Sequence, residues 1–390
     1  MQKLFLLCYD KRANIKGKVE YKNMNYKFTK DDTWAMKGIS ILFLVCIHCL
    51  SQERIQSLDI TFWPLNANIA RWCIRLTGQC VGMFVFLSAY GMTLSTKKQY
   101  PDFEFTKQQA TESVVKRYLR LVFKFLIPFW VCFVVTHALG IQRYTRGLTR
   151  NFISMIADIL CIGNLFGIQM MVPTWWYLSL EVMLIVFLPL ILRFYKKYGW
   201  LSVVMAAIAG TVFCQTLQEN FLTKLLFAVP LAVWFADQGI LEKLKAITLV
   251  QNKILNKIIK TCIVFGVICI LCIFRDKFKM SNTNFTFVLL GLMATALIYF
   301  FYEFIIDLPG LRQILIFFGK HSANIFYIHS FVRGAWLKKV TYSFHSAWMI
   351  VAFVFFVTLA ISIAIEFVAS RSGYNRLTEK IVKKVTAIIR

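Results

Sequence analysis

The sequence is divided into apolar stretches that are each about as long as a membrane is thick. A helix needs ~20 mainly apolar residues to cross the hydrocarbon core of a bilayer. Such stretches recur along most of the chain, and we predict an all-α, polytopic integral membrane protein. The ten predicted spans are residues 34–51, 76–96, 118–140, 174–195, 199–216, 221–238, 259–274, 284–306, 321–338 and 346–369.

The composition supports this prediction. Charged residues make up only 16% of the chain and hydrophobic residues 58%, whereas charged residues are about a quarter of a soluble protein. The net charge of +26 would indicate nucleic-acid binding in a soluble chain, but in membrane proteins Lys and Arg mark cytoplasmic loops. With the amino terminus placed inside, 31 Lys and Arg residues fall in inner segments and 13 in outer ones. We therefore predict cytoplasmic termini and no nucleic-acid partner.

One ten-helix membrane domain is expected over residues 34–369. The polar, basic residues 1–33 and 370–390 are predicted to be cytoplasmic segments that flank it, and residues 1–33 lack the features of a signal peptide. Residues 150–172 are apolar but broken by glycines, which favours a re-entrant or interfacial segment. Residues 240–258 alternate apolar and basic positions at helical spacing, which is typical of an amphipathic helix on a membrane surface.

The cysteines do not indicate a metal site. Cys269 and Cys272 have CxxC spacing but lie within an apolar run, where a thiol without polar neighbours is an inert packing residue. Cys46 and Cys49 lie beside His48, but no second pair of ligands is near them in the sequence. We predict no bound metal.

Two polar residues on the first span are candidates for a functional site. Lys37 and His48 are eleven residues apart, so they differ by only about 20° around the helix and lie about 16 Å apart along it. A charge at bilayer depth costs at least ~2.5–3.5 kcal/mol and marks a functional-site hypothesis. The alternatives are a snorkelling anchor for Lys37 and an interhelical hydrogen bond for His48.

The fourth span carries an acidic residue at membrane depth. The span begins near Pro173, a natural helix start, and Glu181 lies a little under two turns below the aromatic residues that follow it, about 10 Å into the membrane. Trp176 belongs to the aromatic belt before it. A carboxylate that orients an imidazole is one half of a general-base pair. Glu181 and His48 are therefore candidate catalytic residues.

A basic pair and several weaker candidates complete the set. Arg117 and Arg120 lie on one helical face at the inner end of the third span, and paired guanidinium groups suit a polyphosphate ligand. Anionic lipid headgroups are the alternative partners for them. The weaker candidates, which would line an acceptor site or support it, are Ser88, Tyr90, Trp176, Asn324 and His329.

These elements, in this order, resemble the membrane acyltransferase type 3 family. The family's first helix has a basic residue, ten residues and then His, and its later helices carry an aromatic-rich Leu-Ser-Gly-Tyr stretch, Arg-x-x-Arg, Trp-Tyr-Leu-x-x-Glu and Gly-Lys-x-Ser followed by His. The matching segments here are Lys37 to His48, Phe84 to Gly91, Arg117 to Arg120, Trp176 to Glu181 and Gly319 to His329. Ala89 departs from the pattern, because it replaces the glycine that follows the serine.

The resemblance implies an O-acyltransferase of the plasma membrane. It would move an acyl group, expected to be acetyl, from cytoplasmic acyl-CoA to a hydroxyl of a cell-surface glycan or of its lipid-linked precursor. Lys37, Arg117 and Arg120 would bind the phosphates of coenzyme A. His48, oriented by Glu181, would act as the general base or carry the acyl group transiently, and the residues leave both routes open.

The alternative function is a transporter that exports a polysaccharide or lipid precursor. This class predicts an internal repeat and discontinuous helices at corresponding positions, and neither is evident in the sequence.

Overall fold

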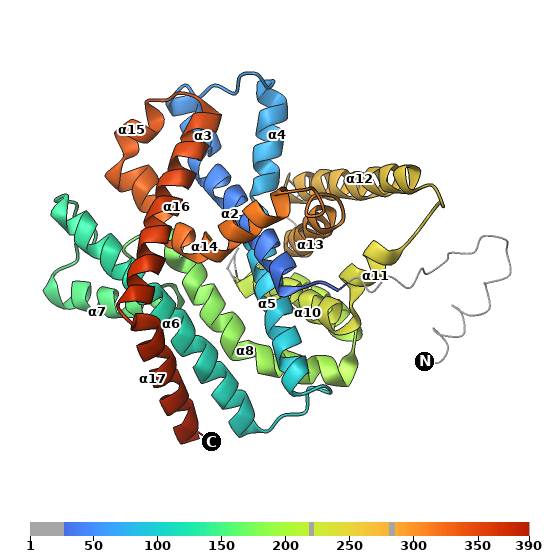
Figure 1. The fold of residues 1–390 in the computed structure, drawn as a ribbon, viewed down its shortest axis with the longest axis horizontal. Coiled ribbons are helices and arrows are strands. Elements are labelled where there is room, and N and C mark those ends of the chain that lie inside the picture. Colours follow the sequence, from blue (N-terminus) through green and yellow to red (C-terminus); the bar gives the residue numbers. More distant parts are fainter. Residues whose placement is uncertain (1–26, 218–221, 281–284, 390) are drawn as a thin grey trace.

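The computed structural model describes residues 27–217, 222–280 and 285–389. The regular structure of this part of the chain is all helical, with no β-strand and only an isolated bridge between Thr61 and Ser346. Figure 1 shows the arrangement of the helices. Their bounds are α2 Lys30–Cys49, α3 Gln52–Ser57, α4 Ala67–Thr77, α5 Cys80–Gln99, α6 Lys107–Ala138, α7 Leu148–Ile159, α8 Trp176–Tyr198, α9 Leu201–Leu217, α10 Leu222–Gln238, α11 Ile240–Ala246, α12 Lys253–Met280, α13 Thr286–Phe304, α14 Leu311–Phe331, α15 Lys338–Tyr342, α16 Ala347–Arg371 and α17 Tyr374–Ile389.

Seven helical segments of the described chain are long and apolar enough to cross a membrane, and the protein is a multi-pass membrane protein. They are α2, α4 with α5, α6, α8 with the turn before it, α12, α13 and α16. The other three predicted spans also form helices, α9, α10 and α14. The first two have 17 residues each. Polar side chains such as Lys320 and Asn324 interrupt the apolar sequence of α14, although the helix itself is continuous. The count of ten and the sidedness of the termini stay predictions.

The predicted amphipathic helix over residues 240–258 is wrong. The chain is helical only to Ala246, and α12 begins at Lys253. Ile247 adopts an extended conformation, and the side chain of Asn252 accepts the backbone N–H groups of Ile254 and Leu255. A side-chain oxygen that caps these free N–H groups starts a new helix, so the segment divides into two elements.

The segment 150–172 forms the short helix α7 followed by loops and the 3₁₀ turns η1, Gly163–Phe166, and η2, Pro173–Trp175. Along α7, Leu148 and Phe152 are exposed while Asp158 is buried. Apolar side chains that face outward at this position are expected of an interfacial helix. The turn η2 begins with Pro173 and leads directly into α8, as the sequence indicates.

Most of the predicted carboxyl-terminal segment forms a further helix, α17, which lies beside the first half of α6 (Figure 1). The Gln108 side chain donates to the Ile389 carbonyl at the start of α6, and the Tyr374 hydroxyl donates to the Phe123 carbonyl, 2.7 Å away, farther along α6. The two helices are therefore antiparallel, and α17 forms one wall of the cleft described below.

Two glycines allow α2 and α14 to cross in direct backbone contact near the centre of Figure 1. A Cβ atom added to Gly38 would lie 2.2 Å from the carbonyl oxygen of Leu315, and one added to Gly319 would lie 1.8 Å from that of Trp34. Small residues permit such close helix packing in membranes, where dispersion forces hold helices together. The crossing is therefore incompatible with any larger residue at either position.

This crossing places His48 and His329 on the same contact seam. Each histidine lies ten residues after its crossing glycine, Gly38 or Gly319. Ten residues correspond to about 15 Å of helix rise and to a step from position a to position d of the next heptad, which faces the same partner helix. The two imidazole rings accordingly meet, with centroids 5.0 Å apart in an edge-to-face arrangement.

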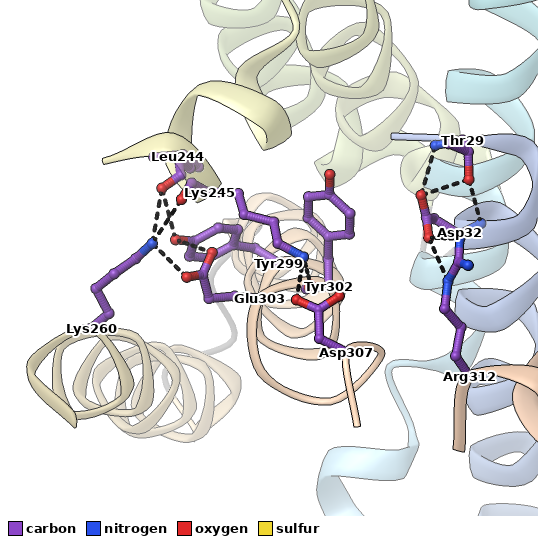
Figure 2. Close-up of polar contacts among 10 residues, drawn as sticks. All are labelled: Thr29, Asp32, Leu244, Lys245, Lys260, Tyr299, Tyr302, Glu303, Asp307 and Arg312. Atoms are coloured by element: carbon purple, nitrogen blue, oxygen red, sulfur yellow. Dashed lines mark hydrogen bonds and ion pairs between the residues drawn. The ribbon is translucent and has the colours of Figure 1, made fainter. Parts of the chain in front are cut away.

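The opposite end of this helix pair, which we call the Lys37 end, is joined by ion pairs (Figure 2). Thr29 and Asp32 form a capping box that starts α2, and Asp32 also accepts from Arg312 of α14 at 2.8 Å. Two further pairs, Lys260 with Glu303 and Lys245 with Asp307, join α12, α13 and the short helix α11. Basic residues that the sequence assigns to inner loops thus also fix the helix ends relative to one another.

Replacement of either crossing glycine by alanine should destabilise the protein. The added methyl group would overlap a backbone carbonyl of the other helix, and overpacking of this kind costs about 1–3 kcal/mol. We expect Gly38→Ala and Gly319→Ala to lower the melting temperature of the detergent-solubilised protein. Gly266→Ala in α12 is the matched control, because its Cβ meets no atom within 4 Å. Equal melting temperatures for all three variants and the wild type would contradict the crossing.

The buried carboxyl of Asp158 predicts a pH-dependent stability. Burial raises its pKa to about 6, although the Tyr144 hydroxyl and the Met171 N–H donate to it. A carboxyl with a raised folded pKa stabilises the fold below its unfolded pKa, and this contribution is lost as the pH rises to about 6. Asn keeps the acceptor oxygen but does not ionise.

The gain in melting temperature from Asp158→Asn over the wild type should therefore be larger at pH 7.5 than at pH 4. Thermal unfolding of both proteins at the two pH values checks this. A gain that is independent of pH, or that is larger at pH 4, would show that Asp158 does not titrate in this way.

Candidate functional site

The imidazole of His329 is held by hydrogen bonds at both nitrogens. Its Nδ1 lies 2.7 Å from the Phe326 carbonyl, and its Nε2 lies 3.1 Å from the Ser330 hydroxyl. The Thr174 hydroxyl donates to the Ser330 oxygen in turn. A carbonyl only accepts, so we assign the proton to Nδ1, and Nε2 then accepts from Ser330. His329 is fully buried and is committed to this chain of hydrogen bonds.

His48 differs from His329 in that its ring nitrogens have no hydrogen-bond partner in the described part of the chain. His48 is partly exposed, and its ring packs edge-to-face against the ring of His329. The backbone carbonyl of His48 accepts from Arg54 at 2.6 Å, which fixes the end of α2. Of the two histidines, His48 is therefore the one whose nitrogens are available to a substrate.

Glu181 lies in a different cluster, in which α2, α5 and α8 meet. The Tyr177 hydroxyl donates to its carboxylate at 3.0 Å, Ser88 lies close enough to act on it, and Lys37 is the nearby opposite charge. No hydrogen bond or ion pair joins Glu181 to His48 among the described residues. The prediction that Glu181 orients His48 thus stays untested, and the geometry links this acid to Lys37.

Lys37 lies close to two further groups. Its ammonium is 5.5 Å from the centre of the Trp34 ring, and its charge interacts with Glu181 and with Lys124 of α6. Lys124 lines a cleft between neighbouring helices. Lys37 therefore lies near that cleft.

That cleft has a volume of about 320 Å³ and lies between α6, α14, α16 and α17. Polar side chains from all four helices line it, together with several apolar ones; the polar ones are Arg120, Lys124, Asn324, Glu366, Tyr374, Asn375, Thr378 and Glu379. We call it the α6–α17 cleft. It combines two cations one helical turn apart with groups that accept or donate hydrogen bonds.

The guanidinium of Arg120 forms a two-point ion pair with Glu379 of α17. Nε and one terminal nitrogen donate to the two carboxylate oxygens, at 3.2 and 2.5 Å. The charge of Arg120 lowers the pKa of Glu379 below its usual value. The Glu379 side chain is 40% exposed, and an ion pair that is partly open to solvent contributes little, so a stronger anion can replace Glu379 at Arg120.

Glu366 of α16 is a functional candidate that the sequence analysis missed. It accepts from the Asn324 side chain at 3.0 Å and interacts with Lys124 and with His321. An acidic residue inside the apolar run 346–369 is the signal that identifies it. Glu366 thus gives the predicted residue Asn324 a partner and adds a negative charge to the α6–α17 cleft.

The structure separates Arg117 from Arg120. Arg117 donates to the Thr96 hydroxyl at 2.8 Å, to the Ser95 hydroxyl and to the Met92 carbonyl, all near the end of α5. Arg120 instead faces α17. The two side chains thus have different partners in this structure, and the prediction that they bind one ligand stays a prediction. Lys124, four residues after Arg120, lines the α6–α17 cleft with Arg120.

Two of the weaker candidates contact structural groups. The Tyr90 hydroxyl lies 3.3 Å from Glu242 of α11 and its ring packs on Phe28, away from His48. Trp176 is half-buried, whereas its neighbour Trp175 is buried and donates to the Tyr327 carbonyl at 3.0 Å. In the described residues, no group of three His, Cys, Asp or Glu side chains has an arrangement that would hold a metal ion.

Comparison with known proteins identifies the family. A family model described as an acyltransferase domain, that of the acyltransferase type 3 family, matches residues 35–367. No curated protein and no solved structure matches the chain. The family match extends from α2 to α16 and covers His48, Glu181, Arg120 and His329. The chain belongs to the acyltransferase type 3 family and is a membrane acyltransferase.

Proposed function

We propose that this membrane acyltransferase transfers an acetyl group from acetyl-CoA to a hydroxyl of a cell-surface glycan or of its lipid-linked precursor, in the plasma membrane. The observation that carries the proposal is the position of two features on one helix. In the first half of α2, Lys37 lies near Lys124 of the α6–α17 cleft. At the other end, His48 offers free ring nitrogens.

The α6–α17 cleft suits the phosphates of coenzyme A. Arg120 can bind phosphate oxygens in the two-point manner in which it now binds Glu379. Lys124 lies one turn farther along the same face of α6 and lines the same cleft. We assign the donor to these two residues and to Lys37, with the pantetheine arm extended along α2 towards His48, about 16 Å from Lys37.

His48 acts as the general base in this proposal. One ring nitrogen takes the proton of the acceptor hydroxyl while the oxygen attacks the thioester carbonyl, and the carbon–sulfur bond then breaks. The proton passes from the imidazole to the departing thiolate, so that coenzyme A and the acetyl ester are the products. The edge-to-face contact with the immobile His329 ring holds His48 in position.

We propose a positioning role for Glu181. Tyr177 and Ser88 hold its carboxylate, and its charge stabilises the buried ammonium of Lys37. A cation inside a membrane domain needs such a partner. Glu181 therefore keeps Lys37 in place between the donor cleft and the seam that leads to His48.

Replacement of His48 by Gln should lower the rate of acetyl transfer by about 10²–10⁴-fold, because positioned acid–base catalysis contributes this factor. Binding of acetyl-CoA, measured as thermal stabilisation of the purified protein, should not change. The control is His137→Gln, an exposed histidine at the end of α6. Full activity of His48→Gln would exclude His48 as the base, and rapid formation of labelled acetyl-enzyme without acceptor would favour the covalent route.

The donor assignment predicts different effects for three basic residues of α6. Arg120→Gln and Lys124→Gln should each weaken acetyl-CoA binding by about tenfold or more, because each removes a charged contact to phosphate. Arg117→Gln should lower the melting temperature instead, since Arg117 ties α6 to α5. Titration of acetyl-CoA in thermal-shift assays separates the two effects. If Arg117→Gln alone weakened binding, the donor would lie outside the α6–α17 cleft.

A further inference from the structure

Two arginines at the His48 end of the helix pair have no part in the reaction as described. Arg54, from the short helix α3, donates to the His48 carbonyl and to the Ser51 hydroxyl, at 2.6 and 2.9 Å. Arg333 lies four residues after His329, in the π-helical segment η3, Val332–Trp336. π-Helical turns are rare and are often found at functional sites.

The charges of both arginines act on His48. Arg333 and Arg54 are the cations that interact with its imidazole, and Arg333 also interacts with the His329 ring. Arg333 acts on the nearby Tyr342 hydroxyl, and its Nε is buried and has no hydrogen-bond partner in the described chain. The two guanidinium groups therefore lie around the candidate base, and one of them has an unused donor.

These two arginines differ from the cations of the Lys37 end in forming no ion pair, although the charge of the neighbouring Glu53 acts on Arg54. Among the described residues, no carboxylate forms an ion pair with Arg54 or Arg333. Burial, together with the charge of Arg333, lowers the pKa of Arg54. Like charges that are held together and partly desolvated are unfavourable until an anion neutralises them.

The role of Arg54 as a cap for the last turn of α2 explains only part of this arrangement. A cation at a helix carboxyl end interacts favourably with the helix dipole, and the bond from Arg54 to the His48 carbonyl is of this kind. It does not account for Arg333, which comes from a different helix and brings a second positive charge to the same place.

We infer that Arg54 and Arg333 bind an anionic group of the acceptor, so that the substrate is a hydroxyl compound carrying a phosphate or carboxylate near the acylated position. This inference rests on the proposed function, because it assigns the acceptor to the His48 end. A guanidinium group binds either anion through paired N–H donors. Binding of the anion between the two arginines brings the neighbouring hydroxyl of the sugar to the free nitrogen of His48.

The chemistry fits two sources of the anion. One is the carboxylate of an acidic sugar, and the other is a phosphate, either on the glycan or in a lipid-linked precursor. Methyl glucuronide and glucose 1-phosphate represent the two sources, and methyl glucoside is a neutral sugar of similar size. The apparent Kd of each sugar is measured from the melting temperature of the full-length protein in neutral detergent as the sugar is added.

At least one charged sugar should bind the wild type ~10-fold or more tightly than methyl glucoside, the difference expected for one charged contact. Tighter binding of methyl glucuronide identifies a carboxylate as the anion, and tighter binding of glucose 1-phosphate identifies a phosphate. Arg333→Gln and Arg54→Gln should abolish the preference, and Arg333→Lys, which keeps the charge, should retain part of it. Arg71→Gln, an exposed arginine of α4, is the matched control and should retain all of it.

Two results would overturn the inference. One is equal affinity of the wild type for all three sugars, or no measurable binding of the charged ones. The other is a preference that survives in Arg333→Gln and Arg54→Gln but is lost in Arg120→Gln, since the charged sugars would then occupy the donor cleft. Stabilisation by acetyl-CoA is measured on the same samples. Its absence counts against the proposed function, whereas the effect of Arg333→Gln on sugar binding tests the anion site separately.

Discussion

The backbone contact between α2 and α14 at Gly38 and Gly319 determines how the candidate residues are arranged. Because neither position has a side chain, the two helices approach until a carbonyl of each occupies the space of the other's Cβ. From this crossing the helices follow one seam for ten residues to His48 and His329. The locked ring of His329 then faces the free ring of His48. A packing contact between two glycines thus positions a chemical group about 15 Å away.

The two ends of this helix pair differ in their electrostatics. At the Lys37 end, basic side chains are paired with acids, as in Asp32 with Arg312 and Lys260 with Glu303 (Figure 2). At the His48 end, Arg54 and Arg333 form no ion pair in the described structure. Paired charges hold helix ends together, whereas unpaired cations are available to a ligand. This difference is consistent with a donor that displaces the exposed Glu379 at one end and an acceptor that supplies its own anion at the other.

Much of the helical architecture could be predicted from the sequence, because hydrophobic length alone identifies a membrane helix. Features that depend on local capping could not. The break between α11 and α12 rests on the Asn252 cap, and α17 forms from a segment whose basic composition indicated only its expected side of the membrane.

The sequence indicated which residues are candidates for the site, but it did not show which of them lie together. Spacing placed Arg117 and Arg120 on one face of a helix, yet their neighbours differ, because α5 lies on one side of α6 and α17 on the other. The contact of His48 with His329 depends on the helix crossing, and spacing within one helix carries no information about that crossing. Glu366 and Arg333 were visible as charges in the sequence, but only the fold shows what they contact.

The central claim is that acetyl-CoA enters the α6–α17 cleft and reaches His48 along the α2–α14 seam. A structure of the full-length protein bound to a non-hydrolysable acetyl-CoA analogue tests it most directly. The account predicts phosphates in contact with Arg120 and Lys124, with Glu379 displaced, and the acyl carbon close enough to His48 for an acceptor hydroxyl to touch both. Phosphates bound beside Arg117 at the end of α5, with the acyl group remote from His48, would contradict it.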